Sequence, residues 1–73
     1  MDTDNLVHMA NRIGQFFQSM PDRAEAVAGV AEHIRKFWEP RMRKQLWAHL
    51  ESTQGEDLLP VVRDAMRAHP ELA

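Results

Sequence analysis

The stretch HIRKFWEPRMRKQLWAHL, residues 33–50, contains the break that decides how this chain folds. Proline disfavours helical geometry at the residue before it and is well placed at the first position of a new helix. We therefore expect one helix to end near Trp38 and another to begin near Pro40. Because the proline ring fixes its own backbone torsion, Pro40 should set the angle between these two helices.

On both sides of this break, apolar residues recur in steps of three and four, a spacing that indicates amphipathic helices. Pro21 predicts the end of the first helix, and Asp22 predicts the N-cap of the second. Gly55 indicates a linker after the third helix, and Pro70 predicts the end of the fourth. We expect helices over about 4–20, 22–38, 40–51 and 57–69, the first two forming an antiparallel hairpin. The predicted fold class is all-α: a small bundle of three to four short helices in a single domain over residues 1–73.

Three residues near the break are expected to be structural. Phe37 should lie in the core, Met42 should lie on the inner face of the third helix, and Pro40 should lie at the junction. Gly14, beside the apolar stripe of the first helix, would let another helix approach closely. Residues 71–73 should fray.

The composition narrows the class of protein. The chain has 73 residues, a net charge of −2 and no cysteine, which excludes disulfides and thiolate metal sites. Its first residues are acidic rather than basic, and no apolar run approaches the roughly 20 residues needed to cross a bilayer. We expect a cytoplasmic protein without a secretory signal or membrane span.

We find no pattern that predicts catalysis, cofactor binding or metal binding. None of the four histidines stands four residues from another, beside a carboxylate, as in a helical zinc site. The three glycines are isolated, so no phosphate-binding loop is predicted. A fold this small is also not expected to hold a small-molecule pocket, which needs some 300–1,000 Å³.

The mixture of aromatic and basic residues in 33–50 has three possible explanations. It could complete the core, bind nucleic acid, or bind a partner protein, because tryptophan and arginine are enriched in binding hot spots. The overall acidic balance argues against nucleic acid. We therefore expect a partner-binding surface at the helix junction, formed by Trp38, Arg41, Arg43 and Trp47. Glu39 is expected to form an ion pair with Arg43, four residues on, and so to hold the arginine side chain in position.

Three blocks of this sequence resemble the delta subunit of NAD-dependent formate dehydrogenase: LVHMANRIGQFF (6–17), HIRKFWEPRMR (33–43) and LLPVVRDAM (58–66). The most specific part is the run from Phe37 to Arg43, and the blocks occur in the family's order and spacing. The segment from Glu51 to Asp57 aligns with nothing in the family. The family pattern supplies no catalytic residue to carry over.

The resemblance implies a subunit without redox cofactors in a soluble bacterial complex. Other subunits of such complexes carry a molybdenum or tungsten pyranopterin cofactor, iron–sulfur clusters and FMN, and reduce NAD. The implied partner is the large alpha subunit. This chain would either stabilise that subunit as a permanent part of the complex or act as a maturation factor that assists its cofactor loading. A stand-alone nucleic-acid-binding protein is the third hypothesis. The isolated chain, with surplus apolar surface, is expected to form a homodimer at high concentration.

Overall fold

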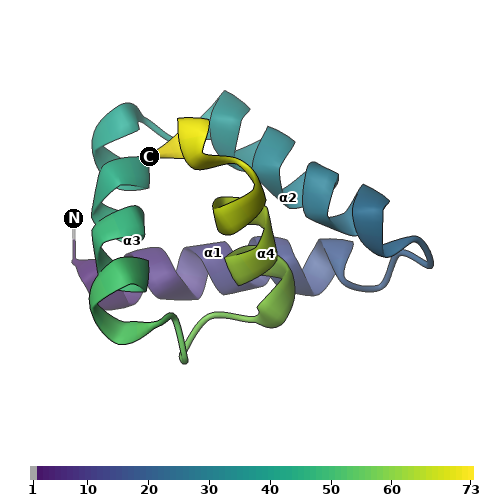
Figure 1. The fold of residues 1–73 in the computed structure, drawn as a ribbon, viewed down its shortest axis with the longest axis horizontal. Coiled ribbons are helices and arrows are strands. Elements are labelled where there is room, and N and C mark those ends of the chain that lie inside the picture. Colours follow the sequence, from purple (N-terminus) through teal and green to yellow (C-terminus); the bar gives the residue numbers. More distant parts are fainter. Residues whose placement is uncertain (1) are drawn as a thin grey trace.

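A computed structural model describes residues 2–73, which form four α-helices followed by one short 3₁₀ turn (Figure 1). Within residues 2–73 there is no strand. The predicted all-α fold class is therefore confirmed. The elements are α1 (Thr3–Phe17), α2 (Arg23–Phe37), α3 (Pro40–Thr53), α4 (Pro60–Ala68) and η1 (Pro70–Leu72).

Local sequence signals account for most helix starts. The Asp22 side chain accepts hydrogen bonds from the backbone N–H groups of Ala24 and Glu25, which caps α2 as predicted. Pro40 is the first residue of α3, and Glu39 before it has extended backbone torsions. The helix break at Glu39–Pro40 is thus confirmed.

Two predicted boundaries are off by three residues. The first helix ends at Phe17 and not at residue 20, because the chain tightens into a turn in which the N–H of Met20 donates to the carbonyl of Phe17. The fourth begins at Pro60 and not at residue 57. Leu59 precedes this proline and is extended (φ −60°, ψ 146°), so the helix cannot begin before it.

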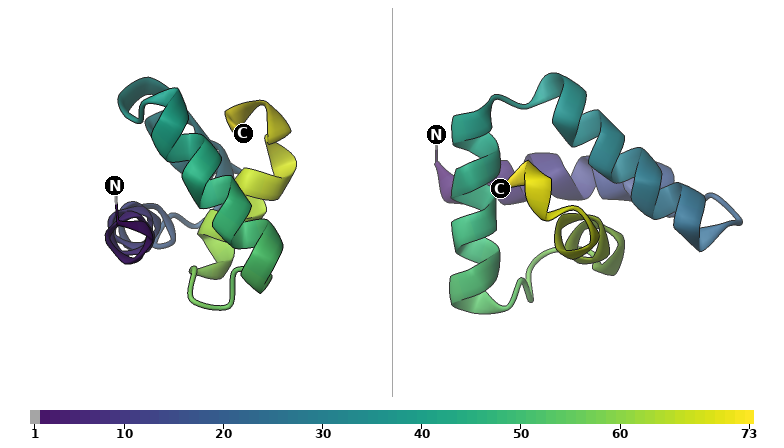
Figure 2. Two further views of the ribbon diagram at one scale, coloured as in Figure 1. Left: turned by 90° about the vertical axis from the view of Figure 1, so that its left-hand side faces the viewer. Right: turned by 45° about the horizontal axis from the view of Figure 1, so that its top comes forward.

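The helices surround one apolar core. From a shared turn, α1 and α2 diverge as the two arms of a V; α4 packs against both arms, and α3 crosses the open end (Figures 1 and 2). Gly14 permits the contact between α1 and α4, since a Cβ there would lie 2.7 Å from Cγ2 of Val62. Among the described residues no polar side chain is buried, and the largest fully buried side chains are Leu6, Val30, Ile34, Leu46, Val61, Val62, Met66 and Leu72.

The C-terminal residues do not fray as expected, because Leu72 is buried and η1 contacts α2, α3 and α4. Glu71 helps to hold this turn through Arg35 of α2, whose Nη2 lies 2.8 Å from the carboxylate. The pKa of Glu71 lies below its ordinary value, chiefly because its own backbone N–H donates to the carboxylate and secondly because His69 does. Apolar burial together with this ion pair therefore orders the last turn.

Candidate partner-binding surface

The structure does not bring the four predicted partner-binding residues together on the surface. Trp38 is only 5% exposed and belongs to the core. It is the residue at which the chain leaves α2, with extended torsions (φ −97°, ψ 134°). By its spacing Trp38 continues the buried stripe of Val30, Ala31 and Ile34, so its place in the core agrees with the apolar pattern of α2.

Phe37 shows the opposite error. It was predicted to be in the core, yet 69% of its surface is exposed. Adjacent residues on a helix point about 100° apart, and α2 buries two such neighbours at Val30 and Ala31, but at its C-terminal end only Trp38 is buried. Since Trp38 takes the core position, Phe37 remains at the surface.

Arg43 is directed toward the protein's own backbone. Its Nη1 donates to the carbonyl of Trp38 (3.1 Å) and its Nε to the carbonyl of Leu72 (3.2 Å). The expected ion pair with Glu39 does not form; these carbonyls take its place. Arg43 therefore joins the end of α2, the start of α3 and η1.

The two remaining members of the predicted surface lie in different surroundings. Arg41 is exposed, whereas Trp47 is half-buried and packs against the core. Trp47 lines a hollow of about 270 Å³ whose polar members include Glu51 and Arg67. With Arg43 turned inward and Trp47 half-covered, the nucleic-acid hypothesis loses two of its expected contacts. Met42, half-buried against the core, has its predicted role.

A different surface exposes the large apolar side chains of this protein. Phe16 of α1 is 72% exposed, and with Phe37 it is one of the two most exposed large apolar residues among those described. Two hollows, of about 400 and 330 Å³, lie beside these phenylalanines. We call their combined lining the aromatic groove; it comprises Met9, Arg12, Ile13, Phe16, Phe17, His33, Phe37, Trp38 and Met42.

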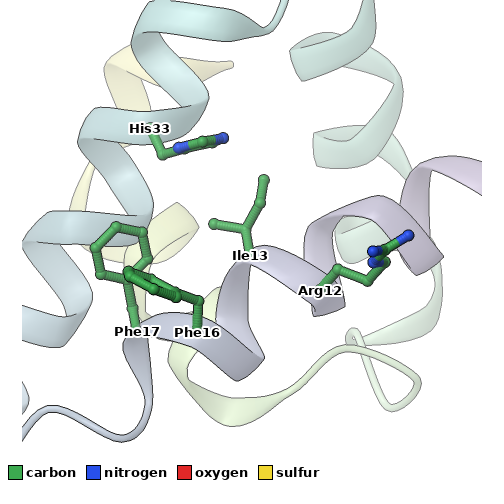
Figure 3. Close-up of a pocket in the computed structure, with 5 residues that line it drawn as sticks. All are labelled: Arg12, Ile13, Phe16, Phe17 and His33. Atoms are coloured by element: carbon green, nitrogen blue, oxygen red, sulfur yellow. The ribbon is translucent and has the colours of Figure 1, made fainter.

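A row of rings crosses this groove from α1 to α2. The rings of Phe16 and Phe17 meet edge to face at 5.0 Å, Phe17 lies 6.4 Å from His33, and His33 lies 4.8 Å from Phe37. Figure 3 shows His33 above Phe16 and Phe17 of α1. The Ile13 side chain lies beside these rings, and Arg12 extends away from them. The first two pairs have the edge-to-face geometry that aromatic rings prefer, and the His33 and Phe37 rings are tilted at 44°.

The hollows are larger than expected for so small a fold, although both are open to solvent and not enclosed. Both volumes fall within the range of ligand pockets. They arise because Phe16 and Phe37 stand out from the surface and form walls on either side of His33. The result is an open apolar groove with one exposed cation, Arg12, at its side.

Sequence reasoning missed Phe16 and Phe37 as surface residues, although a signal was present. Phe16–Phe17 and Phe37–Trp38 are both adjacent pairs of large rings. Both pairs stand at helix ends, and in each pair one ring packs against the core while the other is exposed.

The described residues show little else that could carry chemistry. No three His, Asp or Glu side chains within residues 2–73 lie close enough together to hold a metal ion. No helix in the same range is both long and apolar enough to cross a membrane. Hydrogen bonds link His49 to Asp57 and His69 to Glu71, and His33 lies in the row of rings.

The fold and this surface define a small all-α protein with one apolar core and an open aromatic groove. The chain belongs to the family of the NADH-dependent formate dehydrogenase delta subunit FdsD, whose model matches residues 5–66. All three sequence blocks that carry the resemblance fall within that range. No curated protein and no solved structure matches this chain.

Proposed function

We propose that this chain is a non-catalytic accessory subunit of a cytoplasmic NAD-dependent formate dehydrogenase complex. It binds and stabilises the large, cofactor-bearing subunit through the aromatic groove. The observation that carries the proposal is the exposure of Phe16 and Phe37, which are the two ends of the row of rings. Family membership supports a place in a formate dehydrogenase complex. The exposed groove supports the choice of this surface for the partner.

The energetic reason concerns the exposed rings. Burying a phenylalanine side chain is worth about 1.5–3 kcal/mol, and this fold leaves two of them largely in water. In the monomer each of these rings has one aromatic contact, Phe16 with Phe17 and Phe37 with His33, and is otherwise exposed. A partner that covers both rings would obtain the central, fully desolvated anchors that dominate binding free energy.

The experiment compares two surfaces of the same chain. Tagged large subunit is co-expressed with wild type, with Phe16→Ala/Phe37→Ala, or with the control Arg41→Ala/Lys44→Ala on α3, and the amount of this chain that co-purifies is measured. We expect the phenylalanine pair to lose most of its co-purification, since each anchor is worth ~2 kcal/mol. The control should co-purify as wild type does.

Circular dichroism of each purified variant checks that it is folded. Loss in the control with normal binding by the phenylalanine pair would move the partner site to the surface first predicted around Arg41. Normal binding by both would show that another face is used.

A maturation factor would use the same groove but leave after cofactor loading. The two roles differ in stoichiometry: a permanent subunit remains one-to-one with the large subunit through high salt and gel filtration, whereas a maturation factor is substoichiometric. The proposal also expects that the purified chain alone does not reduce NAD with formate. Without its partner, the chain should self-associate weakly at high concentration, as light scattering would show.

A further inference from the structure

The aromatic groove consists of two hollows that share a common ridge. Arg12, Ile13 and His33 line both of them. Along α1, Met9 lines one hollow and Phe16 the other, seven residues away. At 1.5 Å per residue the groove therefore follows α1 for about 10 Å, which is two helical turns.

Arg12 gives this groove an electrostatic preference. Its guanidinium is exposed, lies beside both hollows, and makes no ion pair or hydrogen bond with any residue in 2–73. Lys36 and Arg35, near the same end of α2 as Phe37, are by contrast paired with Glu32. The lining of both hollows contains no carboxylate. The groove is thus apolar with an unmatched positive charge.

From these features we propose, on the basis of the function proposed above, that the groove receives an amphipathic helix of the large subunit. Two apolar side chains about two turns apart on that helix fill the two hollows, and an aspartate or glutamate of the same helix pairs with Arg12. Helices that dock into grooves use anchors at this spacing. Arginine suits the contact because its planar fork can hold a carboxylate with two hydrogen bonds.

Two other occupants fit less well. An extended peptide would need a sheet edge to pair with, and residues 2–73 contain no strand. A second copy of this chain, docked groove to groove, would bring no carboxylate from its lining to either Arg12. It would instead place two unmatched arginines at one contact, where like charges oppose association.

The test has two stages. First, the immobilised full-length chain is exposed to the formate dehydrogenase complex purified from a strain that lacks this subunit. Second, overlapping peptides of about twenty residues that tile the large subunit are tested for binding by fluorescence polarisation and for gain of helicity by circular dichroism. Variants Arg12→Gln and Arg12→Glu are compared with Arg41→Gln, an exposed arginine outside the groove.

We expect one peptide to bind and to become helical, with apolar residues at i and i+7 and a carboxylate between or beside them. Arg12→Gln should weaken binding of both peptide and complex about tenfold, Arg12→Glu further, and Arg41→Gln less than about twofold. Replacing the peptide's carboxylate by lysine should restore binding to Arg12→Glu.

The failures are distinguishable. If wild type does not bind the complex, the proposed function itself is wrong. If wild type binds and Arg12→Gln and Arg12→Glu bind equally well, the carboxylate contact is refuted while the function stands. A peptide that binds without gaining helicity refutes the helical occupant. A concentration-dependent dimer that blocks peptide binding, and that the Arg12 variants weaken in the same way, would identify a second copy of this chain as the occupant.

Discussion

Gly14 of α1 and Val62 of α4 touch so closely that a Cβ at residue 14 would lie 2.7 Å from the Val62 methyl carbon Cγ2. Leu59 and Val61 stand 3.1 and 3.2 Å from the same point. The expected close approach at Gly14 is therefore confirmed, and it fixes the distance between the two helices.

Replacing Gly14 by alanine should destabilise the fold. In an exposed helix this change stabilises by about 0.5–1 kcal/mol, but here the added methyl must push α4 away, at a typical cost of about 1–3 kcal/mol. Thermal melts followed by circular dichroism, with Gln15→Ala on the exposed side of the same helix as control, measure the difference. An unchanged or higher Tm for Gly14→Ala would show that the contact yields easily.

Trp38 and Phe37 should respond in opposite ways to truncation. Trp38→Ala removes a buried ring and should cost about 3–5 kcal/mol, enough to unfold a domain of this size. Phe37→Ala removes a largely exposed ring and should change stability by less than about 1 kcal/mol. Urea titrations of both variants decide the matter: equal losses would mean that the two rings share the core.

Arg43 should matter for stability and its neighbour Arg41 should not. Arg43→Met keeps most of the side chain's length but removes its hydrogen bonds to the carbonyls of Trp38 and Leu72. We expect a loss of about 2 kcal/mol, since bonds from a charged donor contribute about 1.5–3 kcal/mol. Arg41→Met, exposed on the same helix, serves as the control for lost charge. Matching Tm values for the two variants would show that the carbonyl contacts contribute nothing.

Asn11 fastens the segment before α4 to α1. Its Nδ2 donates to the carbonyl of Asp57 and its Oδ1 accepts from the N–H of Leu59, both at 2.8 Å. Leu59 is the N-cap of α4 and makes no capping bond with its own side chain, so Asn11 supplies an acceptor at this helix start. Asn11→Ala should cost about 1–2 kcal/mol.

Asn11→Asp is the informative partner of that variant. It retains the acceptor for Leu59 but sets a carboxylate oxygen against the carbonyl of Asp57, so we expect it to lose stability as well. Hydrogen exchange at the Leu59 amide should rise in Asn11→Ala and much less in Asn11→Asp. Equal exchange in both would contradict the assigned acceptor role.

Local rules predicted the helices because the signals for them are local. Asp22 caps the residues just after it, and Pro40 acts on Glu39 directly. Arg43 shows where such rules stop: a carboxylate four residues away was available, yet the side chain bonds to Leu72, which is 29 residues distant in sequence. Contacts of that kind depend on the assembled fold, which residue spacing does not encode.

The candidate site was harder to predict than the fold for a related reason. The composition of 33–50 drew attention to the junction, and Phe37 and Met42 of that stretch line the candidate groove. The other half of the groove comes from α1, where Phe16 appeared to belong to the core stripe. Both rings of each adjacent pair fit an apolar stripe by their spacing, so which one turns outward depends on the packing of the assembled fold.

The connection after α3 opposes one way in which copies of this chain could associate. Gln54 (φ 65°) and Gly55 (φ 69°) are consecutive left-handed residues, Gly55 is buried against Leu50, and its N–H and carbonyl are held by Thr53 and Arg63. Straightening this turn, as an exchange of α4 between two molecules requires, would break all of these contacts at once. Any dimer of the isolated chain should therefore form between intact folds, and dissociate on dilution without unfolding.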